Sequence, residues 1–343
     1  MSRWRALQAL PPYLGGKRKL LGQIFKPLPG PAQAPVFVDA FLGGGSVSLM
    51  AKARGYRVLC NDIAERSRII GEALIANDRV ALDEADVLRL FAGEQDGTFI
   101  ADNFAPDVVP SKHARFLDRA FAVASSVDGP KRWLFLLLLL KYVLRLRPMG
   151  NFGAKTIIHQ IEDQNWEAIK PAYMREIVHR GIDGHPKRIC ETLRKQINAG
   201  VFGNGQTNEV HCADVFDFLG QIDGGDLLYL DPPYSGTSAY ETALCPLDSM
   251  LAGQVIDPEP SVFSRRDAVA ALEQLFEASR RFPLWAISYG NAELSLDDLV
   301  GIVRKFRQDV HTESFHYIHL TGLSSAEKRE VNREFLIIAK GDK

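Results

Sequence analysis

The alternation of short β-rich runs with helical periods in the first third of the chain constrains its fold most. Val36–Asp39 is rich in strand-forming residues and leads into the glycines Gly43–Gly45, after which residues 46–54 have a helical period. Tyr56–Cys60 repeats the strand pattern, and a second helical stretch covers residues 65–77. Because neighbouring parallel strands are joined by a crossover helix, this β-α-β-α order predicts a mostly parallel sheet.

Strand patterns return in the last third of the chain. Glu209–Ala213 and Leu227–Leu230 are predicted strands, and each leads into an aspartate. The other elements that we expect here are helices over residues 265–281 and 296–305, strands over residues 284–288 and 335–339, and a turn-rich loop over residues 235–261. These elements complete the α/β pattern of the first third.

Helical periodicity dominates the middle of the chain. The simplest organisation is therefore an α/β domain formed by residues 1–78 and 205–343, with a helical insert over residues 79–204. The whole chain has 41 Lys and Arg against 42 Asp and Glu, a formal net charge of −1. Residues 131–195 alone hold 13 Lys and Arg against 6 Asp and Glu, which is +7 and leaves −8 elsewhere. The insert is thus locally basic, which favours an anionic partner such as nucleic acid.

Composition excludes several protein classes. The 46% hydrophobic and 24% charged residues are typical of a folded globular protein. Cys60, Cys190, Cys212 and Cys245 lie far apart without a CxxC pair, which predicts free thiols in a reducing, cytoplasmic compartment and no zinc site. The leucine-rich run Trp133–Leu140 is shorter than the roughly 20 residues that span a membrane, so it predicts a buried helix and no membrane partner.

Glycines and an aspartate follow the first two predicted strands. Gly43, Gly44 and Gly45 precede a helix, so their backbone can approach a ligand and the helix can offer free N–H groups. A Rossmann-type sheet binds nucleotides at this place, although the spacing differs from GxGxxG. Asp62 stands where an acid can accept hydrogen bonds from ribose hydroxyls. A tight turn and a helix-capping aspartate are the structural alternatives.

The segment Asp231–Tyr234, with two consecutive prolines, carries the most specific signal. It directly follows the strand Leu227–Leu230. Prolines lock the backbone and donate no hydrogen bond, so their carbonyls can face outward from a rigid loop. A carboxylate followed by such carbonyls can accept both hydrogens of an exocyclic amine, and the aromatic ring of Tyr234 can stack on a flat base. A simple rigid turn is the alternative.

These motifs together resemble those of the Dam-type, or alpha-class, N6-adenine-specific DNA methyltransferases. Asp231–Tyr234 resembles the catalytic motif of that family, Asp39–Ser46 its S-adenosylmethionine glycine loop and Tyr13–Lys17 its N-terminal cofactor motif. Asn61–Ile63 matches its ribose-binding acid, and Ala213–Phe216 matches the segment that contacts the cofactor adenine. The motif order is also that of the class, with a target-recognition insert between the glycine loop and the Pro-Pro motif.

The resemblance implies a fold and a set of site residues. The fold is a Rossmann-like class I S-adenosylmethionine-dependent methyltransferase sheet with an inserted, mostly helical target-recognition domain. The implied catalytic residues are Asp231, Pro232, Pro233 and Tyr234. The implied cofactor-binding residues are Tyr13, Gly15, Gly16, Lys17, Asp39, Phe41, Gly43, Gly44, Gly45, Ser46, Asp62, Ile63, Asp214, Val215 and Asp231. No metal ligand is implied.

The implied reaction is methyl transfer from S-adenosylmethionine to adenine N6. Asp231 and the Pro232 carbonyl would hold the two N6 hydrogens, and Tyr234 would stack on the base. Lys17 would meet the carboxylate of the cofactor or the target strand. Because a base inside a duplex cannot reach such a site, the adenine would be flipped out.

Double-stranded DNA is the expected partner, bound by the basic insert of a monomeric enzyme. The candidate DNA contacts are Arg145, Arg147, Lys155, Lys187 and Arg188, within a wider set that adds Lys141, Arg175, Arg180, Arg194 and Lys195. The recognised sequence and any companion restriction enzyme are not readable from the residues.

Two rival interpretations stay open. Asn/Asp-Pro-Pro-Tyr also serves RNA adenine and protein glutamine methyltransferases, whose targets are likewise planar amines or amides. The chain could also be a catalytically silent DNA-binding relic, although the presence of Asp231, Asp62, Lys17 and the glycine loop argues against that. The region after Tyr234 matches no pattern of the family, so how it handles its substrate is not predicted.

Overall fold

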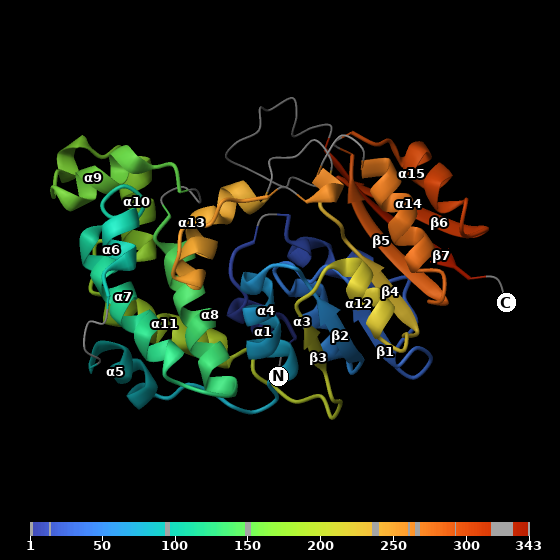
Figure 1. Cartoon of the computed structure of the whole chain (residues 1–343), viewed down its shortest axis with the longest axis horizontal. Helices are drawn as coiled ribbons and strands as arrows, with labels where there is room; N and C mark the ends of the chain where they lie inside the picture. Colours follow the sequence, from blue (N-terminus) through green and yellow to red (C-terminus); the bar gives the residue numbers. More distant parts are fainter. Residues whose placement is uncertain are drawn as a thin grey trace. The chain divides into compact units, whose positions relative to one another are not determined.

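The computed structural model describes residues 3–13, 15–92, 97–147, 152–234, 240–259, 261–264, 268–291, 293–316 and 332–341. The chain divides into two compact units (Figure 1). The sheet unit consists of Tyr13–Gly71, Gly203–Tyr240 and Glu259–Lys343. The helical unit consists of Met1–Pro12, Glu72–Phe202 and Glu241–Pro258. Each unit therefore combines three separate segments of the sequence.

The sheet unit is built on a sheet with the strand order β3-β2-β1-β4-β5-β7-β6. The strands are β1 (Val36–Asp39), β2 (Arg57–Asn61), β3 (Glu209–His211), β4 (Leu227–Leu230), β5 (Leu284–Gly290), β6 (Asp309–His316) and β7 (Arg333–Lys340). The first five in this order are parallel, and β7 is antiparallel to both β5 and β6. This mixed α/β sheet confirms the Rossmann-like methyltransferase fold that the sequence predicts.

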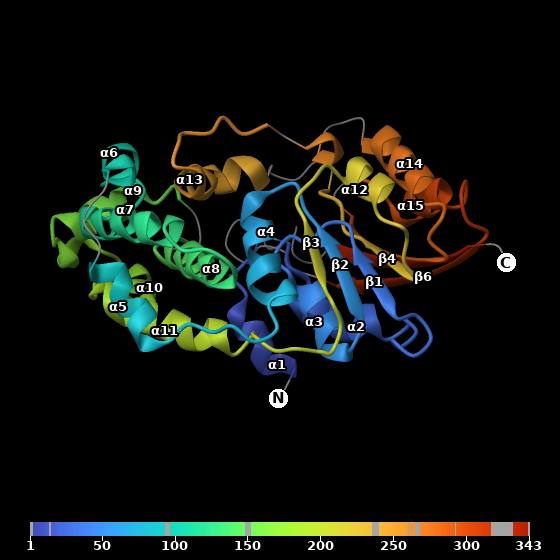
Figure 2. The same cartoon turned by 60° about the horizontal axis from the view of Figure 1, so that its bottom comes forward.

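Helices cover both faces of the sheet. They are α2 (Leu21–Phe25), α3 (Ser46–Arg54), α4 (Glu65–Gly71), α12 (Val215–Gln221), α14 (Ala268–Ala278) and α15 (Leu296–Val303), with the short 3₁₀ turns η2 (Lys17–Leu20) and η6 (Val262–Ser264). Figure 2 shows α2 and α3 on one side of the strands and α12 and α14 on the other. Both faces of the central strands are therefore buried, which explains their nearly continuous apolar sequences.

The period of two along each strand sorts side chains between these faces. Phe37 and Tyr229, on adjacent strands, stack with ring centroids 6.3 Å apart, and Phe25 of α2 stacks on Phe37 at 5.7 Å. The alternate residues Val38 and Leu228 join the core on the opposite face. Because side chains alternate along a strand, the short run Val36–Asp39 supplies both cores.

The helical unit packs around α8 (Pro130–Arg145), the leucine-rich run of the sequence. The other elements of this unit are α1 (Arg3–Ala6), η1 (Leu7–Ala9), η3 (Glu72–Ala76), α5 (Glu84–Ala92), α6 (Phe99–Phe104), α7 (Ser111–Ser125), α9 (Lys155–Glu162), η5 (Trp166–Ala168), α10 (Pro171–Arg180), α11 (Pro186–Asn198) and α13 (Tyr240–Ala252). Leu134, Leu137 and Leu138 of α8 have no exposed surface, so the run is a buried helix as predicted. No helix within the described ranges is long and apolar enough to span a membrane.

One prediction for this region was wrong. The stretch 235–261 was predicted to be a loop, whereas residues 240–252 form α13. Leu244, Leu247 and Met250 are buried along it, so a helical apolar face outweighs the turn signals and the internal proline Pro246. The rest of that stretch includes residues 235–239 and 260, which lie outside the described ranges.

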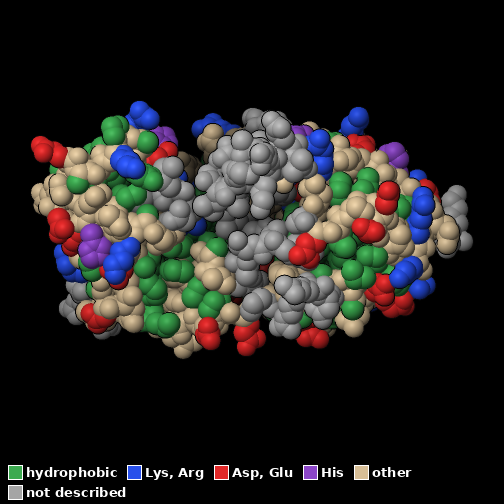
Figure 3. Space-filling model, turned by 90° about the horizontal axis from the view of Figure 1, so that it is seen from above, with side chains coloured by type: hydrophobic (Ala, Val, Ile, Leu, Met, Phe, Trp, Pro, Cys, Tyr) green, Lys and Arg blue, Asp and Glu red, His purple; other side chains and the backbone are tan. Residues whose placement is uncertain are grey.

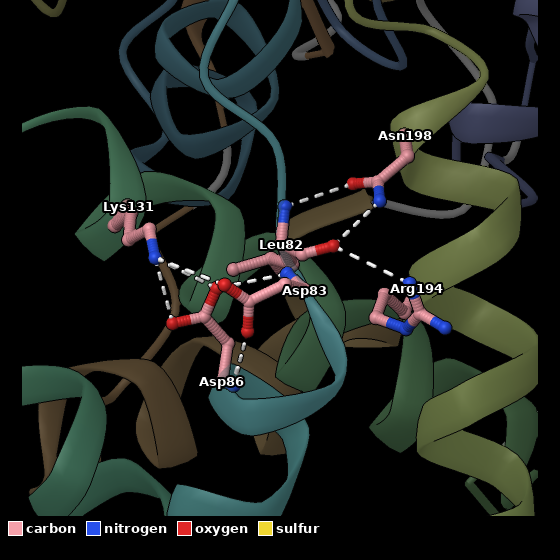
Figure 4. Close-up of polar contacts among 6 residues, drawn as sticks. All are labelled: Leu82, Asp83, Asp86, Lys131, Arg194 and Asn198. Carbon is pink, nitrogen blue, oxygen red and sulfur yellow. Dashed lines mark hydrogen bonds and ion pairs between the residues drawn. The ribbon is translucent and has the colours of Figure 1, made fainter.

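A polar cluster anchors the segment that enters α5 (Figure 4). Asn198 of α11 pairs with both backbone groups of Leu82: the Leu82 N–H donates to Oδ1 at 3.0 Å, and Nδ2 donates to the carbonyl at 2.7 Å. Asp83 and Asp86 each accept a hydrogen bond from the backbone N–H of the other, at 2.8 and 2.9 Å, in the manner of a capping box. Lys131 of α8 reaches both oxygens of Asp86 at 2.9 Å. The start of α5 is thus tied to both α8 and α11.

His113 is the buried titratable group of the helical core. Its Nε2 lies 2.8 Å from the carbonyl of Ile182 and must donate, so Nδ1 accepts from the Tyr142 hydroxyl at 2.6 Å. The imidazole is therefore neutral, and burial lowers the pKa of His113 to about 4.

This pKa predicts an acid-dependent loss of stability. An unfolded histidine titrates near 6.5, so the unfolded state binds more protons between pH 6.5 and 4, and His113 costs the fold about 3 kcal/mol across this window. We expect His113→Gln to flatten the fall of the thermal unfolding midpoint between pH 7 and 4.5, measured by circular dichroism. The exposed His179→Gln serves as control and should follow the wild-type slope. Parallel slopes for His113→Gln and the wild type would contradict the assignment.

Candidate active site

The predicted site residues of the sheet unit meet at the carboxyl ends of its parallel strands. Asp39 ends β1, Asp62 follows β2 and Asp231 follows β4. The order of the strands along the chain runs outward in opposite directions from β1 and β4: β2 and β3 extend the sheet beyond β1, and β5 extends it beyond β4 (Figures 1 and 2). Ligands of open α/β sheets bind outside the carboxyl ends of the strands at such a switch point. The fold therefore brings together acids that stand far apart in the sequence.

The glycine loop turns the chain from β1 into α3. Gly43 and Gly45 have φ of 50° and 73°, in the left-handed region that favours glycine. Gly45 is the residue before α3 and has no side chain with which to cap the helix. The N–H groups of the first turn therefore face the carboxyl edge of the sheet, where they can bind an anionic or polar ligand.

Tyr13 packs directly on this loop. A Cβ added at Gly44 would lie 2.6 Å from the Tyr13 Cβ and 2.9 Å from its Cγ. Burial raises the pKa of the Tyr13 hydroxyl, and the positive charge of Arg66 on α4 opposes this rise. The N-terminal motif and the glycine loop, which the sequence presents as two separate cofactor motifs, are thus packed into one surface.

Asp62 fixes the loop from the other side. Its Oδ2 accepts the N–H of Gly43 at 2.7 Å, and its Oδ1 accepts the N–H of Ala64 at 2.9 Å. The adjacent Ile63 has 72% of its surface exposed, an unusual position for a large apolar side chain. Asp214 caps α12 by accepting the N–H of Phe216 at 2.8 Å. The structure places these residues after β2 and β3, the neighbouring strands.

Asp39 is a second carboxyl group beside Asp231 and is only 1% exposed. The Ser48 hydroxyl donates to its Oδ2 at 2.6 Å, and the Phe41 N–H donates to its Oδ1 at 3.3 Å. Burial, helped by the charges of Asp231 and Asp62, raises the pKa of Asp39 to about 7.

Asp231 is held by a buried network. Lys17 Nζ lies 2.9 Å from Asp231 Oδ1 and 3.3 Å from Glu334 Oε1, and it also donates to the Gly15 carbonyl at 3.1 Å. The Tyr234 hydroxyl lies 2.6 Å from Glu334 Oε1 and 3.2 Å from Asp231 Oδ1. Burial raises the pKa of Asp231, Lys17 opposes this rise, and the charge of Glu334 adds to it.

Several contacts of this network were not predicted from the sequence. Lys17 was expected to meet the cofactor or the target strand, and in the structure it binds Asp231. Tyr234 is only 4% exposed and packs on Tyr289 with ring centroids 4.8 Å apart. Its stacking on a base stays a prediction. Glu334 was missed altogether; the available signal was a charged residue at the head of the apolar run 335–339.

The candidate DNA contacts of the helical unit differ in exposure. Lys155, Lys187, Arg188, Arg175 and Lys195 are exposed; Arg145, Arg180 and Arg194 are half-buried; and Lys141 and Arg147 are buried. On the face shown in Figure 3, Lys and Arg side chains lie among acidic and apolar ones rather than in one block. The DNA-binding roles of the exposed residues therefore stay predictions.

The less exposed candidates have contacts within the protein. Lys141 donates to the carbonyls of Gln8, Ala9 and Leu10 at 2.9, 2.7 and 3.0 Å, so it is withdrawn as a DNA contact. Arg145 donates to the carbonyls of Arg180 and His179.

Besides Arg145, two more of the five leading candidates contact other groups of the protein. Arg147 lies over the ring of Phe152, and burial lowers its pKa to about 10. Lys155 forms an ion pair with Asp107 at 2.6 Å. Lys187 and Arg188 on α11 are the candidates that most directly face solvent.

The close contact of Tyr13 with the glycine loop predicts the effect of one methyl group. Gly44→Ala should force Tyr13 to move and lower the free energy of unfolding of the sheet unit by about 1–3 kcal/mol. Gly30→Ala is the matched control, since nothing lies within 4 Å of a Cβ there. Urea unfolding followed by tryptophan fluorescence measures both, and equal effects of the two substitutions would contradict the packing described.

Comparisons with known proteins agree with this geometry. Over 322 residues, the chain is 29% identical to the Type II methyltransferase M2.HphI of Haemophilus parahaemolyticus, and the alignment covers 92% of this chain and 94% of the relative. A family model matches residues 13–98, which include the Tyr13 motif, the glycine loop and Asp62. Residues 13–98 thus match the model of the D12 class of N6 adenine-specific DNA methyltransferases, in agreement with the family that the motifs predict.

Proposed function

We propose that the chain is a site-specific DNA adenine methyltransferase that transfers a methyl group from S-adenosylmethionine to adenine N6 in double-stranded DNA. The observation that carries the proposal is the position of Asp231. It begins a rigid Pro-Pro segment at the end of β4, beside the glycine loop that follows β1. Both reactants of a methyl transfer can therefore be held at the same switch point.

The residues around the glycine loop fit S-adenosylmethionine. Gly43 and Gly44 leave room for Tyr13, so the N-terminal motif packs directly on the glycine loop. Asp62 is held after β2 by the N–H groups of Gly43 and Ala64, where it would accept hydrogen bonds from a ribose, and the exposed Ile63 would offer an apolar surface to an adenine ring. Asp39 and Asp231 give this end of the sheet a negative field suited to a sulfonium. When bound, the cofactor supplies a methyl group that is already activated for transfer.

Asp231 would position the target amine. Its Oδ1 is occupied by Lys17 and Tyr234, and among the described residues no donor contacts Oδ2. We assign Oδ2 and the Pro232 carbonyl to the two hydrogens of adenine N6. Accepting both hydrogens leaves the nitrogen lone pair directed at the methyl group, which it must approach to about 3 Å in line with the sulfur.

The helical unit would supply the DNA contacts. The target adenine must leave the duplex, which costs a few kcal/mol that phosphate contacts can offset. Lys187 and Arg188 are the exposed basic side chains that we place against phosphates. The name of the relative, a Type II methyltransferase, suggests that this chain also protects the site of a restriction enzyme.

Nucleoside mass spectrometry tests the reaction. Incubation of the wild-type protein with S-adenosylmethionine and unmethylated DNA of mixed sequence should produce N6-methyladenine. Asp231→Ala should lower the rate by at least 100-fold, because it removes the acceptor that positions the amine. Asp223→Ala, an exposed aspartate before β4, is the control and should leave the rate unchanged. Cofactor binding without methylated DNA would direct the search to RNA or protein glutamine.

The salt dependence of binding tests the DNA surface. The double substitution Lys187→Ala, Arg188→Ala should weaken binding to duplex DNA and reduce the slope of log K against log salt by about 2, since each phosphate contact contributes about 0.9. Arg280→Ala, Lys305→Ala removes the same charge from exposed positions of the sheet unit. Fluorescence anisotropy of a labelled duplex measures both. Equal slopes for the two double variants would count against the assigned surface.

A further inference from the structure

Glu334 is a buried carboxylate beside the candidate active site, and it belongs to none of the motifs named in the sequence analysis. It stands near the start of β7, paired in register with Gly290 of β5 and Phe315 of β6, and it is only 1% exposed. From this strand it reaches two residues of the candidate active site. Its Oε1 lies 2.6 Å from the Tyr234 hydroxyl and 3.3 Å from Lys17 Nζ.

The same two residues contact Asp231, and both contacts fall on Oδ1. Lys17 Nζ lies 2.9 Å from that oxygen and the Tyr234 hydroxyl 3.2 Å from it. Glu334 thus holds the Lys17 ammonium and the Tyr234 hydroxyl, the two groups that contact Asp231. Rotation of the carboxylate would break the contact with Lys17 and the longer contact with the Tyr234 hydroxyl, whose one hydrogen is shared with Glu334, so Oδ2 keeps one direction.

The charges of the three residues explain why a second carboxylate is needed. The side chains of Lys17, Asp231 and Glu334 are 4%, 18% and 2% exposed, so their charges interact with little solvent screening. A Lys17–Asp231 pair alone would be neutral, and the ammonium would draw electron density from the carboxylate. Because Glu334 also contacts Lys17, the three side chains of Lys17, Asp231 and Glu334 together carry one net negative charge. Asp231 is the more exposed of the two carboxylates and is therefore the one that can present this charge to a substrate.

Building on the proposed function, we propose that Glu334 is a positioning residue for methyl transfer. It holds Lys17 and Tyr234 on Oδ1 of Asp231 and shares the charge of Lys17, so that Oδ2 faces the substrate amine as a fixed, electron-rich acceptor. Glu334 acts through these residues and does not touch the substrate.

The proposal predicts a direction for the titration of Asp231. Because the charge of Glu334 is one of the causes that raise the pKa of Asp231, its removal should lower that pKa. Five titratable groups face Asp231. Four come from elements of the sheet unit, namely Lys17 of η2, Asp39 of β1, Tyr229 of β4 and Glu334 of β7, and the fifth, Tyr234, comes from the segment after β4. Since Asp231 must be ionised to accept the amine, the acid limb of the pH–rate profile should move to lower pH in Glu334→Gln.

Two measurements on the full-length protein test this. The first is the pH dependence of kcat and of KM for S-adenosylmethionine in wild type, Glu334→Gln, Glu334→Asp and the control Glu313→Gln from the neighbouring strand β6. We expect Glu334→Gln to lower kcat by about 10- to 100-fold with KM changed less than threefold. Glu334→Asp, which keeps the charge, should restore the pH profile, and Glu313→Gln should match the wild type.

The second measurement does not require activity. In protein labelled with ¹³C at aspartate carboxyl groups, the Asp231 resonance, assigned with Asp231→Asn, should titrate at lower pH in Glu334→Gln than in wild type. An unchanged midpoint, or a loss of kcat with an unchanged pH profile, overturns the proposal. Absence of N6-methyladenine with wild type would contradict the proposed function alone, because the resonance still reports on Glu334. If Glu334→Gln does not fold, Tyr234→Phe tests the same network in the opposite direction: it removes a hydrogen bond that lowers the pKa of Asp231, so the Asp231 midpoint should rise, and an unchanged midpoint would overturn the proposal.

Discussion

The ion pair between Lys17 and Asp231 is the interaction on which the candidate active site depends. It joins the N-terminal segment to the end of β4, two parts of the chain more than 200 residues apart in sequence. A buried ion pair stabilises a fold only when its geometry is good and its remaining polar atoms are satisfied. Here the Gly15 carbonyl and Glu334 also contact Lys17, and the Tyr234 hydroxyl contacts both carboxylates. The position of the Tyr13 motif on the glycine loop follows from the same anchoring.

The helical unit meets the same physical problem with a different solution. Lys141, on the leucine-rich helix α8, is buried and donates to the three successive carbonyls of Gln8, Ala9 and Leu10. Backbone carbonyls disperse the positive charge over several dipoles, which suits a structural anchor. The acids around Lys17 leave a net negative charge, which suits a site that must attract a cation. The choice of partner thus separates a structural lysine from one in a candidate active site.

The parts of this fold that could be predicted are those with a local signal. Val36–Asp39 and Leu227–Leu230 are strands with the predicted ends, because short apolar runs bounded by turn residues are decided locally. Strand β6 was not predicted, since its sequence Asp309–His316 is mostly polar and its pairing with β7 decides its structure. Glu334 was missed for the same reason. Its partners Lys17 and Tyr234 are distant in sequence, and no spacing rule connects them.

The three-segment construction of the sheet unit has a consequence for synthesis. Strand β2 ends at Asn61, but its outer neighbour β3 begins only at Glu209. Strand β4, the other neighbour of β1, begins only at Leu227. At 5–20 residues per second, the ribosome needs about 7–30 s to make the intervening chain of about 150 residues. Throughout that time β1 and β2 have only each other as partners, with two open edges, while the segment Glu72–Phe202 of the helical unit can already fold from local contacts. The order of the sequence therefore lets this segment form before β3 and β4 can join the sheet.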